Sequence, residues 1–317
     1  MRLPTPVALG AYAGGLAVAF LAAFAVGDRV APLTASTTTE NDSSGHAHSD
    51  GAAPLPGTPA RLSDAAGLPG LAVSAAGYTL VPQRTWLSAG PAVRFQFTVT
   101  GPDGRPVTSY TESHERDLHL VVVRRDYGHF QHVHPRMASD GRWSVALDLS
   151  AGGIYRVFAD FRPAALESSL TLGTDVHVKG TYVPLALPQP AAEARVDGYG
   201  VTLDGSPVAG REVELTFTVA EAGQPVTHLQ PYLGAFGHLV SLREGDLAYL
   251  HTHPTQGGPA AGHGASAGGH GAHGDGHGGP DVRFTTEFPT AGRYRLFLEF
   301  RVDGVVRTAE FTVAVAP

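Results

Sequence analysis

Apolar residues follow two different patterns along this 317-residue chain. Residues Val7 to Val26 form one uncharged run of about twenty residues, which as a helix matches roughly the hydrocarbon thickness of a bilayer. Further on, apolar residues come in short segments rich in Val, Phe and Leu and bounded by Gly, Pro or Asp, such as Ala92 to Val99, Trp143 to Leu149 and Val213 to Val219. No later window sustains a helical period, so the pattern predicts short β-strands behind an N-terminal helix.

The N-terminal run has two interpretations. Residues 1–30 are a transmembrane anchor, or a signal peptide cleaved near the small residues Ala23 and Ala25. We expect an uncleaved anchor, because the run is longer than a usual signal core and only Arg2 and the amino terminus supply positive charge. The expected location is then the cell membrane, single-pass, with the C-terminal domains extracytoplasmic; cleavage would make the protein secreted. Residues 31–69, rich in Ala, Ser, Thr, Gly and Pro, are expected to form a disordered linker.

The remainder of the chain is an internal repeat. Pro106-Val107-Thr108 matches Pro225-Val226-Thr227 at an offset of 119 residues, and "VRFQFTV" at 93–99 matches "VELTFTV" at 213–219. Downstream, "YRVFADFR" at 155–162 matches "YRLFLEFR" at 294–301 at an offset of 139, so the extra residues lie in one loop. The repeat predicts two homologous domains, 70–190 and 191–317, each near the size of one sandwich.

Each repeat places Gly and then Tyr just before an aromatic strand, in "AGGIYRVFADF" and "AGRYRLFLEF". This order resembles the tyrosine corner of immunoglobulin-like (Ig-like) sandwiches. The predicted fold is therefore all-β, with two tandem Ig-like β-sandwich domains after the N-terminal helix and the linker. The 40 Gly and 24 Pro fit many turns, and the absence of Cys excludes disulfides, thiolate zinc sites and a blue-copper centre. A dispersed net charge of −7 with no basic face argues against a nucleic-acid partner.

Three histidines recur at one spacing in both repeats. They are His119, His132 and His134 in "HLVVVRRDYGHFQHVHP", and His238, His251 and His253 in "HLVSLREGDLAYLHTHP". In the second copy a two-residue turn at Gly245-Asp246 would set His238 opposite His253, and His251 opposite Val240. All three rings would then emerge on one face, a geometry that zinc and copper sites use. In the first copy, Asp126-Tyr127 followed by Gly128 leaves the turn length and register less certain.

The inserted loop, residues 257–280, is rich in Gly and carries four further candidate ligands: His263, His270, His273 and His277. Such a composition cannot build a core and is typical of low-complexity metal-binding tracts. We expect a disordered loop that collects metal weakly beside the folded histidines. The alternative is a Gly-rich expansion tolerated at a loop tip.

Enzymatic activity is not expected. The chain has no Gly-x-Ser-x-Gly elbow, phosphate-binding loop, dinucleotide fingerprint or His-Glu-x-x-His helix. Glu112, Glu115 and Asp117 precede His119, but the second repeat has no acids there, so we expect them on a solvated loop or strand edge. The alternative to metal binding is that the histidines are structural, in an Ig-like structural or interaction module of the cell envelope.

The two histidine motifs, each followed by the Ala-Gly and Tyr-Arg strand, resemble a family of uncharacterised membrane-anchored or secreted actinobacterial proteins over about residues 70–317. Their sandwich domains are similar in outline to extracytoplasmic copper-handling and YtkA-like modules. The resemblance implies heavy-metal handling, with copper favoured over zinc, although the absence of Cys and of a Met cluster departs from Cu(I) carriers. Neutral imidazoles suit Cu(II) and Zn(II). The expected partners are the metal ion and, through the N-terminal helix, the membrane; the sequence identifies no protein partner.

Overall fold

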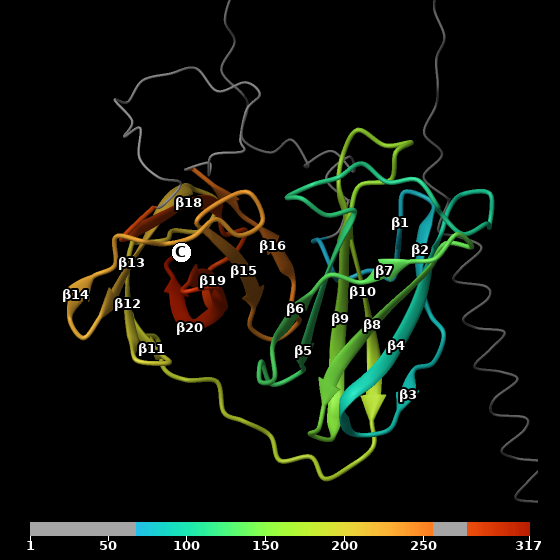
Figure 1. Ribbon diagram of the computed structural model, residues 1–317, viewed down its shortest axis with the longest axis horizontal. Helices are drawn as coiled ribbons and strands as arrows, with labels where there is room; N and C mark the ends of the chain where they lie inside the picture. Colours follow the sequence, from blue (N-terminus) through green and yellow to red (C-terminus); the bar gives the residue numbers. More distant parts are fainter. Residues whose placement is uncertain (1–67, 256–277) are drawn as a thin grey trace, which may run out of the picture. The chain divides into compact units, whose positions relative to one another are not determined.

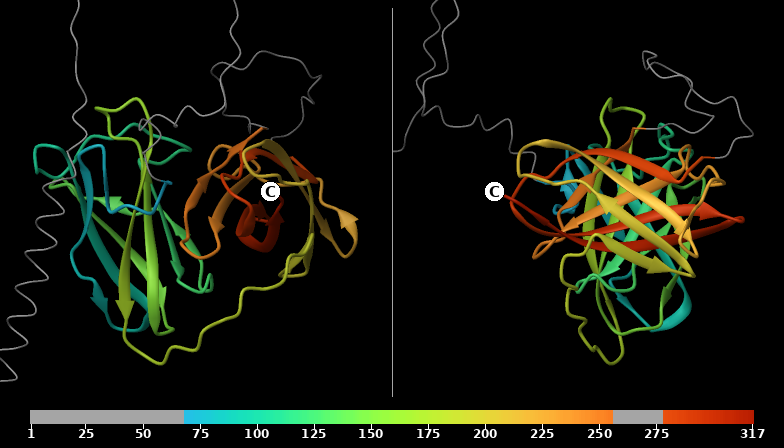
Figure 2. Two further views of the ribbon diagram at one scale, coloured as in Figure 1. Left: turned by 180° about the vertical axis from the view of Figure 1, so that it is seen from behind. Right: turned by 90° about the vertical axis from the view of Figure 1, so that its left-hand side faces the viewer.

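The computed structural model describes residues 68–255 and 278–317, and it is all-β as predicted (Figure 1). The predicted anchor, nearly all of the linker and most of the histidine-rich loop lie outside the described residues. Within the described ranges no helix is long and apolar enough to cross a membrane. The strands form four sheets, two in each β-sandwich (Figures 1 and 2).

The first sandwich joins one sheet in the order β1-β2-β4-β8-β7 to another in the order β3-β10-β9-β5-β6. All pairs in it are antiparallel except β3 with β10. The strands are β1 (Ser74–Ala75), β2 (Tyr78–Pro82), β3 (Trp86–Leu87), β4 (Gly90–Thr100), β5 (Leu118–Arg124), β6 (Gln131–Val133), β7 (Arg136–Met137), β8 (Arg142–Leu149), β9 (Gly153–Phe161) and β10 (Leu170–Val178).

The second sandwich repeats the plan, with one sheet in the order β11-β12-β13-β18-β17, β14 at the end of β13, and a second sheet in the order β16-β15-β19-β20. The strands are β11 (Glu193–Val196), β12 (Tyr199–Asp204), β13 (Glu212–Glu221), β14 (Gln224–Pro225), β15 (Gly237–Arg243), β16 (Tyr249–His251), β17 (His253–Pro254), β18 (Asp281–Glu287), β19 (Gly292–Val302) and β20 (Val305–Val315).

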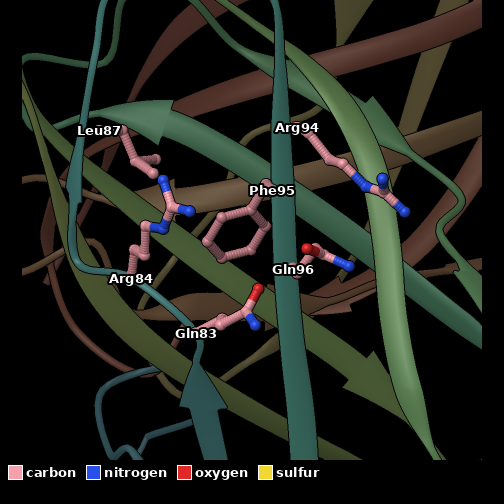
Figure 3. Close-up of a pocket in the computed structure, with 6 residues that line it drawn as sticks. All are labelled: Gln83, Arg84, Leu87, Arg94, Phe95 and Gln96. Carbon is pink, nitrogen blue, oxygen red and sulfur yellow. The ribbon is translucent and has the colours of Figure 1, made fainter.

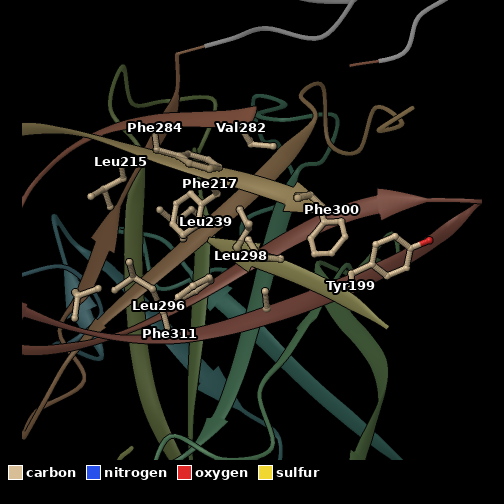
Figure 4. Packing of buried hydrophobic residues seen from close by; sticks show 14 of the residues in the cluster. Tyr199, Leu215, Phe217, Leu239, Val282, Phe284, Leu296, Leu298, Phe300 and Phe311 are labelled. Atoms are coloured by element: carbon tan, nitrogen blue, oxygen red, sulfur yellow. The ribbon is translucent and has the colours of Figure 1, made fainter. Parts of the chain in front are cut away.

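Each sandwich has its own hydrophobic core between its two sheets. In the second sandwich the core includes Phe217, whose ring centroid lies 5.8 Å from that of Phe284 and 5.4 Å from that of Phe311 (Figure 4). Burial alternates along β13 and β18, as period-2 side-chain placement requires for a sheet with one face toward solvent. The alternation seen in the sequence therefore marks the sheet that contains β13 and β18, which we call the outer sheet of this sandwich; the other sheet, with β15 and β19, is the inner sheet.

The tyrosine corners are confirmed in both repeats. The Tyr155 hydroxyl donates to the carbonyl of Ala151 at 2.8 Å, and the Tyr294 hydroxyl donates to the carbonyl of Thr290 at 2.9 Å. Both tyrosine side chains are fully buried. Each bond holds the turn that precedes the tyrosine's own strand, β9 or β19. The repeated Gly-Tyr spacing therefore indicates the same fold in both repeats.

The central strands of the inner sheet of each sandwich, β5 and β9 in the first and β19 in the second, are buried on both faces. All seven residues of β5 are buried, and β9 and β19 are buried nearly throughout, although a sheet with a solvated face would alternate. Their second faces form a third apolar cluster that contains residues of both sandwiches: Val121, Val123, Tyr127 and Phe158 with Val240, Leu242, Leu247, Tyr249 and Phe297. The two sandwiches belong to one compact unit of the chain and share this apolar interface.

Two specific contacts accompany that cluster. Phe130 and Phe297 stack with ring centroids 4.0 Å apart. The Tyr127 hydroxyl donates to the carbonyl of Arg243 at 3.2 Å and accepts from the amide of Gly245 at 2.7 Å. The interface therefore has directional bonds as well as apolar area.

Candidate metal centre

The first histidine trio lies on the hairpin of β5 and β6. Val121 pairs with His132, so His132 shares a face with Val121 and with His119 two residues earlier on β5. His134 follows directly after β6. This placement agrees with the predicted common face.

The ring nitrogens of this trio converge. His119 Nδ1 lies 3.1 Å from His132 Nε2 and 3.3 Å from His134 Nε2, and one nitrogen from each ring lies within 4.8 Å of the others. Four ligands arranged tetrahedrally at a zinc–nitrogen distance of about 2.05 Å stand about 3.3 Å apart. Among the His, Asp and Glu side chains of residues 68–255 and 278–317, these three form the group whose possible ligand atoms lie close enough together to hold one metal ion.

The outward nitrogens of two rings have acceptors. His119 Nε2 lies 3.0 Å from the carbonyl oxygen of Ser113, and His132 Nδ1 lies 2.5 Å from Glu299 Oε2. A carbonyl or carboxylate oxygen only accepts, so each of these nitrogens carries the proton. In neutral rings the inward nitrogens, His119 Nδ1 and His132 Nε2, then face each other with lone pairs.

Two lone pairs at 3.1 Å do not form a hydrogen bond, so this pair of tautomers is unfavourable without a bridging group. One solution is a metal ion bound by both nitrogens. The other is a proton on His132 Nε2 that is donated to His119 Nδ1, with His132 Nδ1 either donating to the Glu299 carboxylate or accepting from its carboxylic acid. The geometry alone permits both solutions.

Burial holds two of the rings in their neutral form. It lowers the pKa of His119 to about 4, helped by the neighbouring His132, and it lowers the pKa of His134 to about 3, helped by His132 and His119. His119 is 5% exposed. Neutral imidazole is the form that binds metal, and neither ring needs to lose a proton near neutral pH to do so.

The second sandwich contributes directly to this cluster. The His238 ring stacks on His132 with centroids 4.7 Å apart and lies parallel to His119 at 5.7 Å. His114, in the turn before β5, lies 6.1 Å from His119 and 6.0 Å from His238. The sequence predicted one separate site in each domain, whereas the structure brings a histidine of the second trio to the first.

The hairpin predicted for the second trio is correct in part. Val240 pairs with His251 as expected, although the connection is longer than two residues, since the Arg243 amide donates to the carbonyl of Ala248. His253 is not opposite His238: it pairs with Thr285 in the other sheet.

The reason for this sheet change is the residue between the two histidines. Thr252 is buried, and its hydroxyl donates to the carbonyl of Leu239 at 2.6 Å, an acceptor that a continuing ladder would use. The chain then crosses to β18. The structure describes the backbone of His251 and His253, and the loop residues His263, His270, His273 and His277 lie outside its described ranges.

Glu299 and His114 are site residues that the sequence reasoning missed. A signal for Glu299 was present, because the aligned strands "YRVFADFR" and "YRLFLEFR" each carry one acid, Asp160 and Glu299, among apolar residues. The two acids also have equivalent registers, with Asp160 opposite His119 and Glu299 opposite His238. By contrast, Glu112, Glu115 and Asp117 are exposed, as expected.

A separate pocket in the first sandwich has a different character (Figure 3). It is lined by Gln83, Arg84, Leu87, Arg94, Phe95 and Gln96. It contains two guanidinium groups and no imidazole or carboxylate, so it has none of the ligands of a transition-metal site.

Comparison with known families shows which family the chain belongs to. It belongs to the family described as "Domain of unknown function (DUF8832)", which matches residues 73–180 and 194–317. The expected membership in a family of β-sandwich proteins is thus confirmed, and the likeness to copper-handling modules stays a prediction. No curated protein matches the chain.

Solved structures give distant matches. The Escherichia coli adhesin FdeC is 16% identical, with 78% of this chain and 66% of that chain covered and a TM-score of 0.23. InvD of Yersinia pseudotuberculosis is 14% identical, with coverages of 77% and 58% and a TM-score of 0.22. The chain therefore spans about 60% of these two structures, and likenesses this weak add no argument to the β-sandwich fold described above.

Proposed function

We propose that His119, His132 and His134 bind one divalent transition-metal ion, Cu(II) or Zn(II). The observation that supports this proposal is the convergence of three ring nitrogens, two of them at 3.1 and 3.3 Å from His119 Nδ1, with the outward nitrogens of two rings already bonded. Outward bonds to a carbonyl and a carboxylate are the partners that metal-bound histidines usually have.

The donor set fits these two ions. Imidazole nitrogen suits both, and at a given nitrogen site Cu(II) binds more tightly than Zn(II), so copper is the first expectation. Three protein ligands leave a further coordination position for water or another donor. The proposal is of binding and not of catalysis, because the carboxylate that contacts the trio, Glu299, is engaged by His132.

The wider role rests on the sequence. An N-terminal anchor would hold the sandwiches outside the cytoplasm, where the protein would take part in heavy-metal handling. His238, His251 and His253 are proposed as ligands of a second site, and His263, His270, His273 and His277 as weaker ligands that collect metal. The equivalent registers of Val121 with His132 and of Val240 with His251 support the second site.

A second candidate is an Ig-like structural or interaction module of the cell envelope. The fold supports this candidate better than it supports metal handling, since it consists of two β-sandwiches joined through an apolar interface. In this case a protonated His132 would bridge His119 and Glu299, and the histidines would join the sandwiches without metal.

Competition titration with a Cu(II) or Zn(II) chelator separates the two candidates. The untagged full-length chain should bind tightly, and His134→Ala should lose that event while metal-free stability falls by no more than about 1 kcal/mol, the net value of one hydrogen bond. His129→Asn removes an exposed imidazole of the same domain and should bind like the original protein. Equal binding by all three proteins, or no tight binding by any, would favour the structural module.

A further inference from the structure

We propose that Glu299 of the second sandwich is a positioning residue for the metal site of the first, so that metal affinity depends on the docking of the two sandwiches. The inference rests on the proposed function and adds a dependence of metal affinity on the second sandwich: the site is complete only when both domains contribute. Glu299 itself is not a metal ligand in this proposal; it acts through His132.

The placement of Glu299 is unusual for a carboxylate. It lies in the middle of β19, 4% exposed, between Leu298 and Phe300, which are fully buried. A charge in such a place is unfavourable unless it is paired. Its partner is in the other domain: Glu299 Oε2 lies 2.5 Å from His132 Nδ1, and the His132 side chain is fully buried.

The bond determines which nitrogen of His132 can bind a metal. A carboxylate is an acceptor, so it keeps the proton on Nδ1 and leaves the lone pair on Nε2, the nitrogen 3.1 Å from His119 Nδ1. A neutral amide in place of the carboxylate has a donor group as well. It can bond the unprotonated Nδ1 and move the ring proton to Nε2, which would then donate to His119 Nδ1 and occupy the space of the metal.

The same strand connects this bond to domain docking. Phe297 is two residues before Glu299 and so points to the same face of the sheet, where it stacks on Phe130 of the first sandwich at 4.0 Å. Both contacts cross the same interface, one apolar and one polar. A change that loosens the stack should therefore displace the carboxylate from His132 and weaken metal binding without removing any ligand.

The test compares Glu299→Gln with Glu214→Gln in the full-length chain. Glu214 is the control because it is an exposed glutamate of the same sandwich, on β13 in the other sheet. In metal-free protein, ring ¹⁵N NMR should show His132 protonated on Nδ1 in the original protein and in Glu214→Gln, and protonated at least partly on Nε2 in Glu299→Gln. Metal affinity should fall about 10- to 100-fold in Glu299→Gln and stay unchanged in the control.

Two further variants keep the inference open to refutation. Phe130→Ala should reduce metal affinity although it removes no ligand. Glu299→Asp, which retracts the carboxylate by one methylene, should also reduce metal affinity, and it replaces Glu299→Gln in the test if that variant does not fold. Tight binding by the original protein with equal affinity in the Glu299 and Phe130 variants would overturn the inference and leave the metal function standing. Absence of tight binding in the original protein would instead refute the proposed function.

Discussion

Acidification should destabilise the metal-free protein well above the pH at which carboxylates protonate. In the unfolded chain an imidazole protonates near pH 6.5, whereas burial lowers the pKa of His119 to about 4 and that of His134 to about 3 in the folded protein. Between these values the unfolded state binds more protons than the folded state. The free energy of unfolding therefore falls as the pH falls from 6.5. The contribution of the two neutral rings to stability is fully present above that pH.

The magnitude follows from proton linkage. Between pH 6.5 and pH 5 each ring with such a lowered pKa contributes about 1.6 kcal/mol, so the two rings together contribute about 3 kcal/mol. That is a large share of the stability of an ordinary domain, about 5–15 kcal/mol. Asp126 and Asp246 also have lowered pKa values. Burial alone would raise the pKa of Asp126, but its bonds to Arg124 and Leu185 outweigh that effect, and the pKa of Asp246 is lowered mainly by its bond to Arg243. Their contribution is lost only as the pH falls through the normal carboxylate range, below this window.

Urea unfolding of metal-free protein at pH 7.5, 6.5, 5.8 and 5.0 measures this effect. His134→Asn should lose about half of the pH dependence, and His129→Asn, with its exposed ring outside the cluster, should keep all of it. A free energy of unfolding that changes by less than about 1 kcal/mol across this range, or the same dependence in His134→Asn, would refute the view that both rings are held neutral by burial.

Three other predictions concern the frame around the site. Tyr294→Phe removes the corner bond to Thr290 and should lower the free energy of unfolding by about 1 kcal/mol in urea titrations; an unchanged value would show that the bond is not stabilising. Deleting residues 258–276 should leave the thermal midpoint nearly unchanged, because loop closure varies by only about 0.6 kcal/mol per doubling of length. The deletion should also remove weak metal binding, and loss of a tight event would mean that the loop supplies ligands. Protease added to intact cells should remove a C-terminal epitope, and a protected epitope beside digested surface controls would contradict the extracytoplasmic location.

The fold could be predicted from the sequence because its signals are local and occur twice. Tyr155 and Tyr294 make the same bond four residues back, and the strands that follow them carry similar patterns. The register of His251 with Val240 was also predictable, because it depends only on the centre of the hairpin. The transfer of His253 to the other sheet was not, because it depends on the bond from Thr252 to Leu239, which no spacing rule contains.

The candidate site was predictable only within one domain. His119, His132 and His134 come together through a single hairpin, so the repeated spacing indicated the group although the register of this copy could not be derived from its turn. The contacts of His238 and Glu299 with His132 depend on how two sandwiches dock, and docking is decided by apolar faces such as that of Phe297 with Phe130. The nearly continuous apolar residues of "LHLVVV" in β5 and "LFLEF" in β19 were the available hint, since strands with no solvated face need a second covering layer.

The central claim is that the inward nitrogens of His119, His132 and His134 bind a metal ion, and site-resolved ¹⁵N NMR of the histidine rings during a Zn(II) titration tests it most directly. The account predicts that, with the first equivalents of zinc, the signals of His119 Nδ1, His132 Nε2 and His134 Nε2 move together to metal-bound values, while the protonated outward nitrogens of His119 and His132 keep their protons. If these three nitrogens keep their metal-free signals at saturating zinc, or if His132 is already an imidazolium in the metal-free protein and remains one, the cluster is structural and the account is wrong.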